Sequence, residues 1–139
     1  LVTALSISGL PTGRFTFEGF LPMNKKNRRA HLDSLRQEQR TMIFYEAPHK
    51  LLSTLEDLAE AFGENRPISL CRELTKLHEQ IWLTTVGEAL EFYTENPPKG
   101  EFVLIVAGGV FETEEKTLTL EDVAQRCIEI MENENPTHF

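Results

Sequence analysis

The sequence predicts an α/β fold in which a mixed sheet of about five strands is flanked by helices. First, five short segments have the apolar or alternating pattern of strands, at residues 15–20, 41–45, 68–72, 80–85 and 101–107. Second, segments with helical periodicity lie between them. Third, 139 residues, of which 40% are hydrophobic and 26% charged, suit one globular domain with a single core.

The first elements are expected to be a helix, a strand and a second helix. Residues 1–8 have the pattern of a helix end, and Gly9 stands where a left-handed C-cap is usual. Phenylalanines alternate with polar residues over 15–20, which indicates a strand with one buried face. Asn24 can cap a helix over 25–39. That helix has a narrow apolar stripe, so we expect most of it to face water or a polar partner.

The middle of the chain predicts three strands and the clearest helix. Residues 41–45 are almost continuously apolar, as in a strand that is covered on both faces. Over 48–62, leucines and a phenylalanine recur at i, i+4, i+7 and i+11, which is one core-facing stripe, and Gly63 ends the helix. Two further strands follow at 68–72 and 80–85.

The last part predicts a short helix at 88–93, a central strand and a final helix. Residues 101–107 are the most hydrophobic strand, which favours a position inside the sheet. A helix is expected over 120–132, in a stretch where eight acidic residues stand against two basic ones. We therefore divide the chain into a domain at 1–110 and an acidic helical segment at 111–139.

Composition limits the class of protein. The longest apolar run, 102–107, is far below the roughly 20 residues that a membrane helix needs. We expect a soluble cytoplasmic protein with no membrane contact. Cys71 and Cys127 lie apart with no CxxC pair, so we expect buried reduced thiols and no metal site. The first residue is Leu1, inside a predicted helix, and we expect that a preceding part has been removed.

Charge is unevenly distributed. The net charge is −8, yet residues 24–40 contain six basic and two acidic residues, a local charge of +4, so the remainder sums to −12. Four cations fall within five residues: Lys25, Lys26, Arg28 and Arg29. Neutralising phosphate would explain such a cluster in an acidic chain, so these four residues are the candidate RNA-binding residues.

Polar clusters follow or precede the predicted strands. They lie at 45–49 (YEAPH), 72–76 (RELTK) and 99–101 (KGE), while the common phosphate, hydrolase and metalloprotease motifs are absent from the sequence. Open α/β sheets bind ligands outside strand ends. The first two clusters would share a rim if their strands were parallel neighbours.

Each feature has a structural and a functional interpretation. Glu46 and His49 form either a capping pair at the following helix or the border of a ligand site. The 72–76 cluster is either an ion-paired turn or a phosphate contact. Trp82 and Tyr93 are either core or interface aromatics or base-stacking residues.

Four segments, in order, resemble the signature blocks of a known family. They are SGLPTGRFTFEGFLP, RTMIFYEAPHK, CRELTK followed by HE, and KGEFVLIV. These resemble the ribosomal RNA cytidine 2'-O-methyltransferases of the tetrapyrrole methylase superfamily. The resemblance runs from about residue 4 to residue 108.

The resemblance implies the C-terminal half of a two-domain S-adenosylmethionine-dependent enzyme, with the cofactor in the cleft between the halves. It implies methylation of a cytidine of 16S ribosomal RNA in the small subunit, pairing with the missing N-terminal domain, and a homodimer. We expect the fragment alone to be inactive. Matched by position, the cofactor wall would be Leu10, Pro11, Tyr45, Glu46, Leu74, Glu101, Phe102 and Val103.

No residue is identified as the catalytic base. Two other classes of function remain open from the sequence. One is a small-molecule methylase acting on a tetrapyrrole, which would not require the basic helix. The other is an RNA-binding or dimerisation module without catalysis.

Overall fold

The computed structural model describes residues 1–73, 77, 79–110, 124–125, 127–128 and 130. Its strands are β1 (Phe15–Phe20), β2 (Thr41–Glu46), β3 (Pro67–Arg72), β4 (Gln80–Thr85) and β5 (Phe102–Val106). They form one five-stranded sheet in the order β1-β2-β5-β3-β4. The predicted fold class is confirmed, and β5 is central, as its hydrophobicity indicated.

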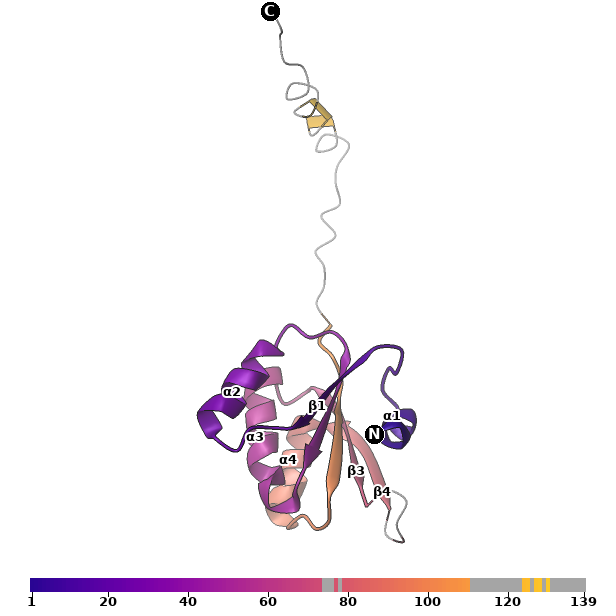
Figure 1. Ribbon diagram of the computed structural model, residues 1–139, viewed down its shortest axis with the longest axis vertical. Coiled ribbons are helices and arrows are strands. Elements are labelled where there is room, and N and C mark those ends of the chain that lie inside the picture. The colour runs from indigo at the N-terminus through magenta and orange to yellow at the C-terminus, as the bar shows by residue number, and fades with distance from the viewer. Residues whose placement is uncertain (74–76, 78, 111–123, 126, 129, 131–139) are drawn as a thin grey trace, which may run out of the picture.

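The helices lie on both faces of this sheet. They are α1 (Val2–Ile7), α2 (Lys25–Ser34), α3 (Leu51–Phe62) and α4 (Val86–Glu95), and a short 3-10 turn η1 (Pro48–Lys50) precedes α3. Figure 1 shows α2, α3 and α4 together on one side of the sheet and α1 on the other. One face is therefore well covered, whereas in the described part of the chain the other carries a single six-residue helix.

Strand directions bring the polar clusters to one edge. β1 is parallel to β2, while β5 is antiparallel to both β2 and β3. β2 and β3 consequently run in the same direction, but β5 separates them, so the condition that their strands be parallel neighbours is met only in direction. Their carboxyl ends still share a rim, because the antiparallel strand between them places its own beginning there.

The main core lies between the sheet and α2, α3 and α4. Met42, Phe44, Leu104 and Val106 of the sheet are fully buried there. They pack with Leu51, Leu55 and Leu58 of α3, which confirms the stripe predicted for that helix. Burying each such side chain contributes roughly 1.5–3 kcal/mol, so this layer is the chief stabilising element of the domain.

The second face has a smaller core and an exposed strand. Ala4 and Leu5 of α1 pack on Ile43, Cys71 and Ile105. The phenylalanine face of β1 is not buried as predicted, since Phe15 and Phe17 are 41% and 52% exposed. Their pairing with Thr41 and Ile43 puts them on the side of α1. No described helix covers that side at β1.

Several boundaries differ from the predicted ones. α2 ends at Ser34 because Leu35 leaves helical geometry and a turn follows, in which Glu38 N–H donates to the Leu35 carbonyl. α4 begins earlier than predicted, since the Thr85 hydroxyl accepts a hydrogen bond from Glu88 N–H and caps it.

The C-terminal expectations fall largely outside the described residues. They are the helix predicted over 120–132 and the acidic segment predicted over 111–139. Of the two thiols, Cys71 is buried as expected, but Cys127 is exposed and that expectation is wrong. No helix among the described residues is long and apolar enough to cross a membrane.

Candidate functional site

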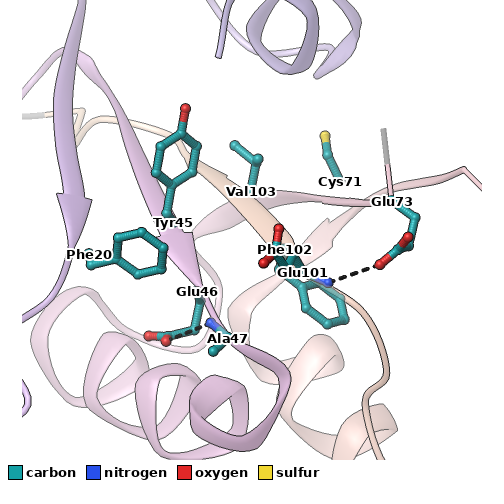
Figure 2. A pocket seen from close by; sticks show the side chains of 9 residues that line it. All are labelled: Phe20, Tyr45, Glu46, Ala47, Cys71, Glu73, Glu101, Phe102 and Val103. Carbon is teal, nitrogen blue, oxygen red and sulfur yellow. Dashed lines mark hydrogen bonds between the residues drawn. The ribbon is translucent and has the colours of Figure 1, made fainter. Parts of the chain in front are cut away.

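A cavity of about 390 Å³ opens where four strands meet at one edge of the sheet. This volume lies within the range of small-molecule sites. The lining comes from the ends of β1, β2 and β3 and the beginning of β5 (Figure 2). The lining residues are Phe20, Tyr45, Glu46, Ala47, Cys71, Glu73, Glu101, Phe102 and Val103.

The side chains on the side of α1 form the apolar wall. Tyr45 pairs with Val103, and Val103 pairs with Cys71, so the three point to the same face of the sheet. Figure 2 shows them directed the same way, with Phe20 beside Tyr45. Phe102 points to the other face and is 2% exposed. It therefore borders the cavity mainly through its backbone.

Glu46 is anchored in the fold rather than open to the cavity. Glu46 is 5% exposed, and its carboxylate accepts hydrogen bonds from Ala47 N–H at 2.9 Å and from the Thr54 hydroxyl at 2.6 Å. The carboxylate thus joins the end of β2 to α3, but neither η1 nor α3 has a side-chain capping hydrogen bond, so the predicted capping pair is not formed. His49 is exposed in η1 and is not among the residues that line the cavity.

The beginning of β5 is fixed by Glu73. One carboxylate oxygen of Glu73 accepts a hydrogen bond from Glu101 N–H at 3.2 Å, and Glu73 N–H donates to the Glu101 carbonyl at 3.3 Å. Glu73 has a positive φ of 53°, and Gly100 has one of 80°. A Cβ atom on Gly100 would overlap the Glu73 carboxylate. Glu73 therefore packs closely against Gly100 and is hydrogen-bonded to Glu101.

Arg72 and Cys71 are also engaged within the fold. The Arg72 guanidinium donates to the Lys99 carbonyl at 3.2 Å, which ties β3 to the same turn. Burial raises the pKa of the Cys71 thiol, and the Ser69 hydroxyl opposes the shift in part. A thiol in its neutral form is a poor nucleophile, so Cys71 serves as an apolar part of the wall.

The predicted cofactor wall is only partly assembled in this cavity. Five of its residues line it: Tyr45, Glu46, Glu101, Phe102 and Val103. Leu10 instead packs on the small core beneath α1, and the Pro11 carbonyl accepts from the Thr41 hydroxyl at the opposite end of β2. Leu74 lies outside the described residues.

Sequence reasoning missed four lining residues. Ala47 and Glu73 lay inside the clusters that were singled out, at 45–49 and 72–76, and could have been included. Phe20 could have been found because it ends a strand parallel to β2. Cys71 carried no signal beyond its position before the RELTK cluster.

The basic cluster divides into two pairs. Arg28 is 11% exposed and donates to Asp57 at 2.5 Å, and Arg29 donates to Asp57 at 3.3 Å and to Glu60 at 2.9 Å. Lys25 and Lys26 are exposed, and neither is in an ion pair with any described carboxylate. Two of the four cations are therefore neutralised internally.

Trp82 and Tyr93 belong to the main core. Their ring centroids lie 6.3 Å apart, Tyr93 contacts Phe102 at 5.6 Å, and both pack against the buried cluster beneath the helices. Burial raises the pKa of Tyr93. Both aromatics lie on the opposite face of the sheet from Tyr45, which supports the core interpretation.

Among the described residues, carboxylates are the strongest proton acceptors that line the cavity. Glu46 and Glu73 are hydrogen-bonded within the fold, whereas Glu101 is exposed. None of the described lining residues is histidine or lysine. The described residues also contain no group of three or more metal-ligating side chains. The arrangement is suited to holding a ligand of mixed apolar and polar character.

The chain matches a known protein family. Residues 1–90 match the model of the tetrapyrrole (corrin/porphyrin) methylases. The chain belongs to this family, whose members are S-adenosylmethionine-dependent methylases.

Among individual proteins, the chain is similar to ribosomal RNA small subunit methyltransferase I of several bacteria. It is 53% identical to the Synechocystis sp. protein over 112 residues, 81% of this chain and 40% of that protein. It is 41% identical to the Pseudomonas aeruginosa protein over 138 residues, 98% of this chain and 48% of that protein. The chain thus spans less than half the length of these two relatives.

Solved structures share the fold at low identity. The crystal structure of the methyltransferase CobJ superposes with a TM-score of 0.60 at 21% identity, over 78% of this chain and 47% of that one. A cobalt precorrin-4 methyltransferase gives 0.52 at 16% identity, over 75% and 46%. These likenesses show the fold alone.

Proposed function

We propose that this chain supplies one wall of the cofactor cleft in an S-adenosylmethionine-dependent methyltransferase that 2'-O-methylates a cytidine of 16S ribosomal RNA. The observation that carries the proposal is the cavity at the convergence of β1, β2, β3 and β5, lined by five of the eight expected wall residues. The similarity to ribosomal RNA small subunit methyltransferase I supports the choice of substrate.

The cavity fits the proposed cofactor in size and chemistry. Tyr45 and Val103 present an apolar surface to an adenosine or thioether group. The N–H groups of Ala47 and Glu101 are engaged within the fold, but their carbonyl oxygens, which each accept a hydrogen bond there, have a second lone pair that can accept from a nucleoside. When bound, S-adenosylmethionine supplies an electrophilic methyl group. The residues described here bind and orient, and Glu73 holds the backbone at Glu101 in place.

This chain would form only one side of the cofactor cleft. We therefore propose that the other side is formed by a domain corresponding to the additional residues of its relatives. Rate acceleration in methyl transfer depends strongly on aligning the acceptor oxygen with the methyl group. That alignment requires both sides of the cleft. By this proposal the chain alone is inactive, pairs with an N-terminal domain and forms a homodimer in the whole enzyme, in the cytoplasm where small-subunit RNA is assembled.

The first test is calorimetric titration with S-adenosylhomocysteine. This chain and a version extended to the length of its relatives are titrated in parallel. We expect binding by the extended protein and little or none by the chain alone. Tight binding by the chain alone would contradict a cleft shared between two halves.

The second test concerns the acceptor atom. The extended protein is incubated with small-subunit RNA and a methyl-labelled donor, and the product is hydrolysed in alkali. A 2'-O-methyl group removes the hydroxyl that attacks the adjacent phosphate, so labelled dinucleotides should survive hydrolysis. Label released only in mononucleotides would indicate methylation of a base and would overturn the proposed acceptor.

Charge reversal at Lys25 and Lys26 distinguishes an RNA substrate from a small-molecule substrate. Lys25→Glu and Lys26→Glu should weaken RNA binding and leave S-adenosylhomocysteine binding unchanged. Arg28 and Arg29 are unsuitable for this purpose because reversing their charge breaks the contacts with Asp57. RNA affinity that is unaffected by the lysine changes would favour a tetrapyrrole substrate or a module without catalysis.

A further inference from the structure

A cluster of exposed aromatic rings stands at the mouth of the cavity. Phe17 and Phe20 are 52% and 69% exposed. Tyr45 joins them, with ring centroids 5.3 Å from Phe17 and 5.6 Å from Phe20. Exposing large apolar rings side by side is unfavourable in water, and such patches commonly mark a binding surface. We call these three residues the aromatic platform.

The platform adjoins the cavity. Phe20 and Tyr45 line it, and Figure 2 shows their rings together at one side of it, next to Val103. The β-bulge between Phe17 and Gly19 keeps Phe20 in register with Tyr45 at the end of β1. Anything that stacks on Phe20 therefore lies within reach of a group held in the cavity.

The unpaired cations follow the platform closely in the chain, but they begin α2, which lies on the other side of the sheet. Since β1 is an edge strand, a bound nucleic-acid strand reaches both by crossing that edge. Four residues separate Phe20 from Lys25, so their Cα atoms are at most roughly 18 Å apart. Lys25 and Lys26 are exposed and unpaired within the described part of the chain, whereas Arg28 and Arg29 are neutralised by carboxylates. In a protein with a net charge of −8, this combination complements a polyanion that also offers flat rings.

We propose that the aromatic platform, with Lys25 and Lys26, is the surface on which a single-stranded RNA segment lies next to the cavity. A base stacks on Phe20, and the lysines neutralise the following phosphates. Proteins that act on unpaired nucleotides combine stacking on aromatic side chains with cations along the backbone. The inference rests on the proposed function, and it places the RNA by stacking as well as by charge.

The test compares substitutions at the end of β1, beside the cavity, with matched substitutions at its beginning. Phe20→Leu removes the ring but keeps an apolar side chain, and Lys25→Gln with Lys26→Gln removes two charges. The matched controls are Phe15→Leu and Arg14→Gln at the beginning of β1, where an exposed ring also lies beside an exposed cation. Binding of a fluorescent single-stranded RNA oligonucleotide to the extended protein is measured by anisotropy at several salt concentrations.

The expected results differ between the two kinds of variant. Phe20→Leu should weaken RNA binding about tenfold without changing the salt dependence, because stacking is not electrostatic. The double lysine variant should reduce the slope of log affinity against log salt by about 1.4, or 0.7 for each phosphate contact in single-stranded RNA. The controls should leave both quantities unchanged.

Two outcomes would overturn the aromatic platform. Equal RNA affinity in Phe20→Leu and in Phe15→Leu would overturn the platform. A change in sedimentation behaviour on Phe20→Leu would do so as well, since it would make the platform a protein interface. S-adenosylhomocysteine titration of the unsubstituted protein tests the proposed function separately, so a failed platform with intact cofactor binding leaves that function standing.

Discussion

The carboxylate of Asp57 shows how much one buried side chain can organise. Asp57 is 4% exposed and accepts hydrogen bonds from Arg28 and Arg29, which precede it by 29 and 28 residues. It thereby fixes α2 against α3. A buried cation that loses its partner is strongly destabilising, by about 3–5 kcal/mol.

We expect Asp57→Asn to lower the free energy of unfolding by about 3 kcal/mol, because the Arg28 guanidinium would remain buried without a counter-charge. Urea denaturation followed by circular dichroism measures the change. The control is Asp33→Asn, whose ion pair with Arg36 is half exposed on both sides; its effect should stay within about 0.5 kcal/mol. Equal effects of the two substitutions would show that Asp57 has no special structural role.

At the scale of elements, the junction of β3 and β5 decides the shape of the cavity. Gly100 adopts a φ of 80°, and the Glu73 carboxylate occupies the space where a side chain at 100 would stand. The left-handed conformation costs a non-glycine residue roughly 1–2 kcal/mol. The beginning of β5 therefore depends on both residues.

Gly100→Ala should destabilise the fold by at least about 1 kcal/mol and weaken S-adenosylhomocysteine binding by the extended protein, because Glu73 must move away from Glu101 N–H. Thermal denaturation and calorimetry give the two readouts. Gly13→Ala is the matched control, since a Cβ atom there meets no other atom within 4 Å and its φ is not positive. Cofactor affinity that is unchanged in a folded Gly100→Ala variant would argue against a positioning role for Glu73.

The loop between α2 and β2 carries a pH-sensitive contact. Hydrogen bonds from Arg40 lower the pKa of Glu38 from 4.5 to about 2. The Glu38 carbonyl also accepts from Gly109 N–H at 2.8 Å, which links the loop to the end of β5. Because the folded-state pKa is depressed, this contribution to stability is complete above about pH 4.5 and is lost as the pH falls toward 2.

We expect Glu38→Gln to be less stable than the unsubstituted chain at pH 6, and the difference to shrink steadily between pH 4.5 and 2. Urea midpoints at several pH values in that interval measure it. Glu88→Gln, on the exposed first turn of α4, provides a control with a different local partner. A difference that stayed constant down to pH 2 would contradict the shifted pKa.

At the scale of the whole molecule, the two faces of the sheet differ in coverage. Among the described residues, three helices cover one face, whereas α1 is the one helix that covers part of the other (Figure 1). Exposed apolar side chains consequently gather on the second face, on both outer strands: Phe15, Phe17 and Phe20 on β1, and Ile81 and Leu83 on β4. Faces of this kind favour association.

The chain alone should therefore bind an apolar dye such as anilinonaphthalene sulfonate and self-associate as its concentration rises. The version extended to the length of its relatives should do both less, because the proposed second half would cover the part of this face that lies away from the aromatic platform. Dye fluorescence and sedimentation velocity give independent readouts. Equal dye binding by the two proteins would mean that the added length covers none of the face.

The sequence alone determined the order and kind of the elements, because periodicity and turn residues act within a few positions. All five strands lie where their patterns predicted them, and the described residues of the three polar clusters, among them Glu46, Glu73 and Glu101, meet at one rim. The stripe of α3 was equally local, since its leucines recur on one side of a single helix.

Only the tertiary structure decided which of these residues act together. It buried Arg28 against Asp57, turned the phenylalanines of β1 outward, and left Pro11 at the opposite end of β2 from the cavity. It also paired Glu73 with Glu101 across two strands. The physical reason is that partners distant in the chain are selected by strand order, register and coverage of the sheet, whereas the pattern of a short segment reports only which of its own residues share a face.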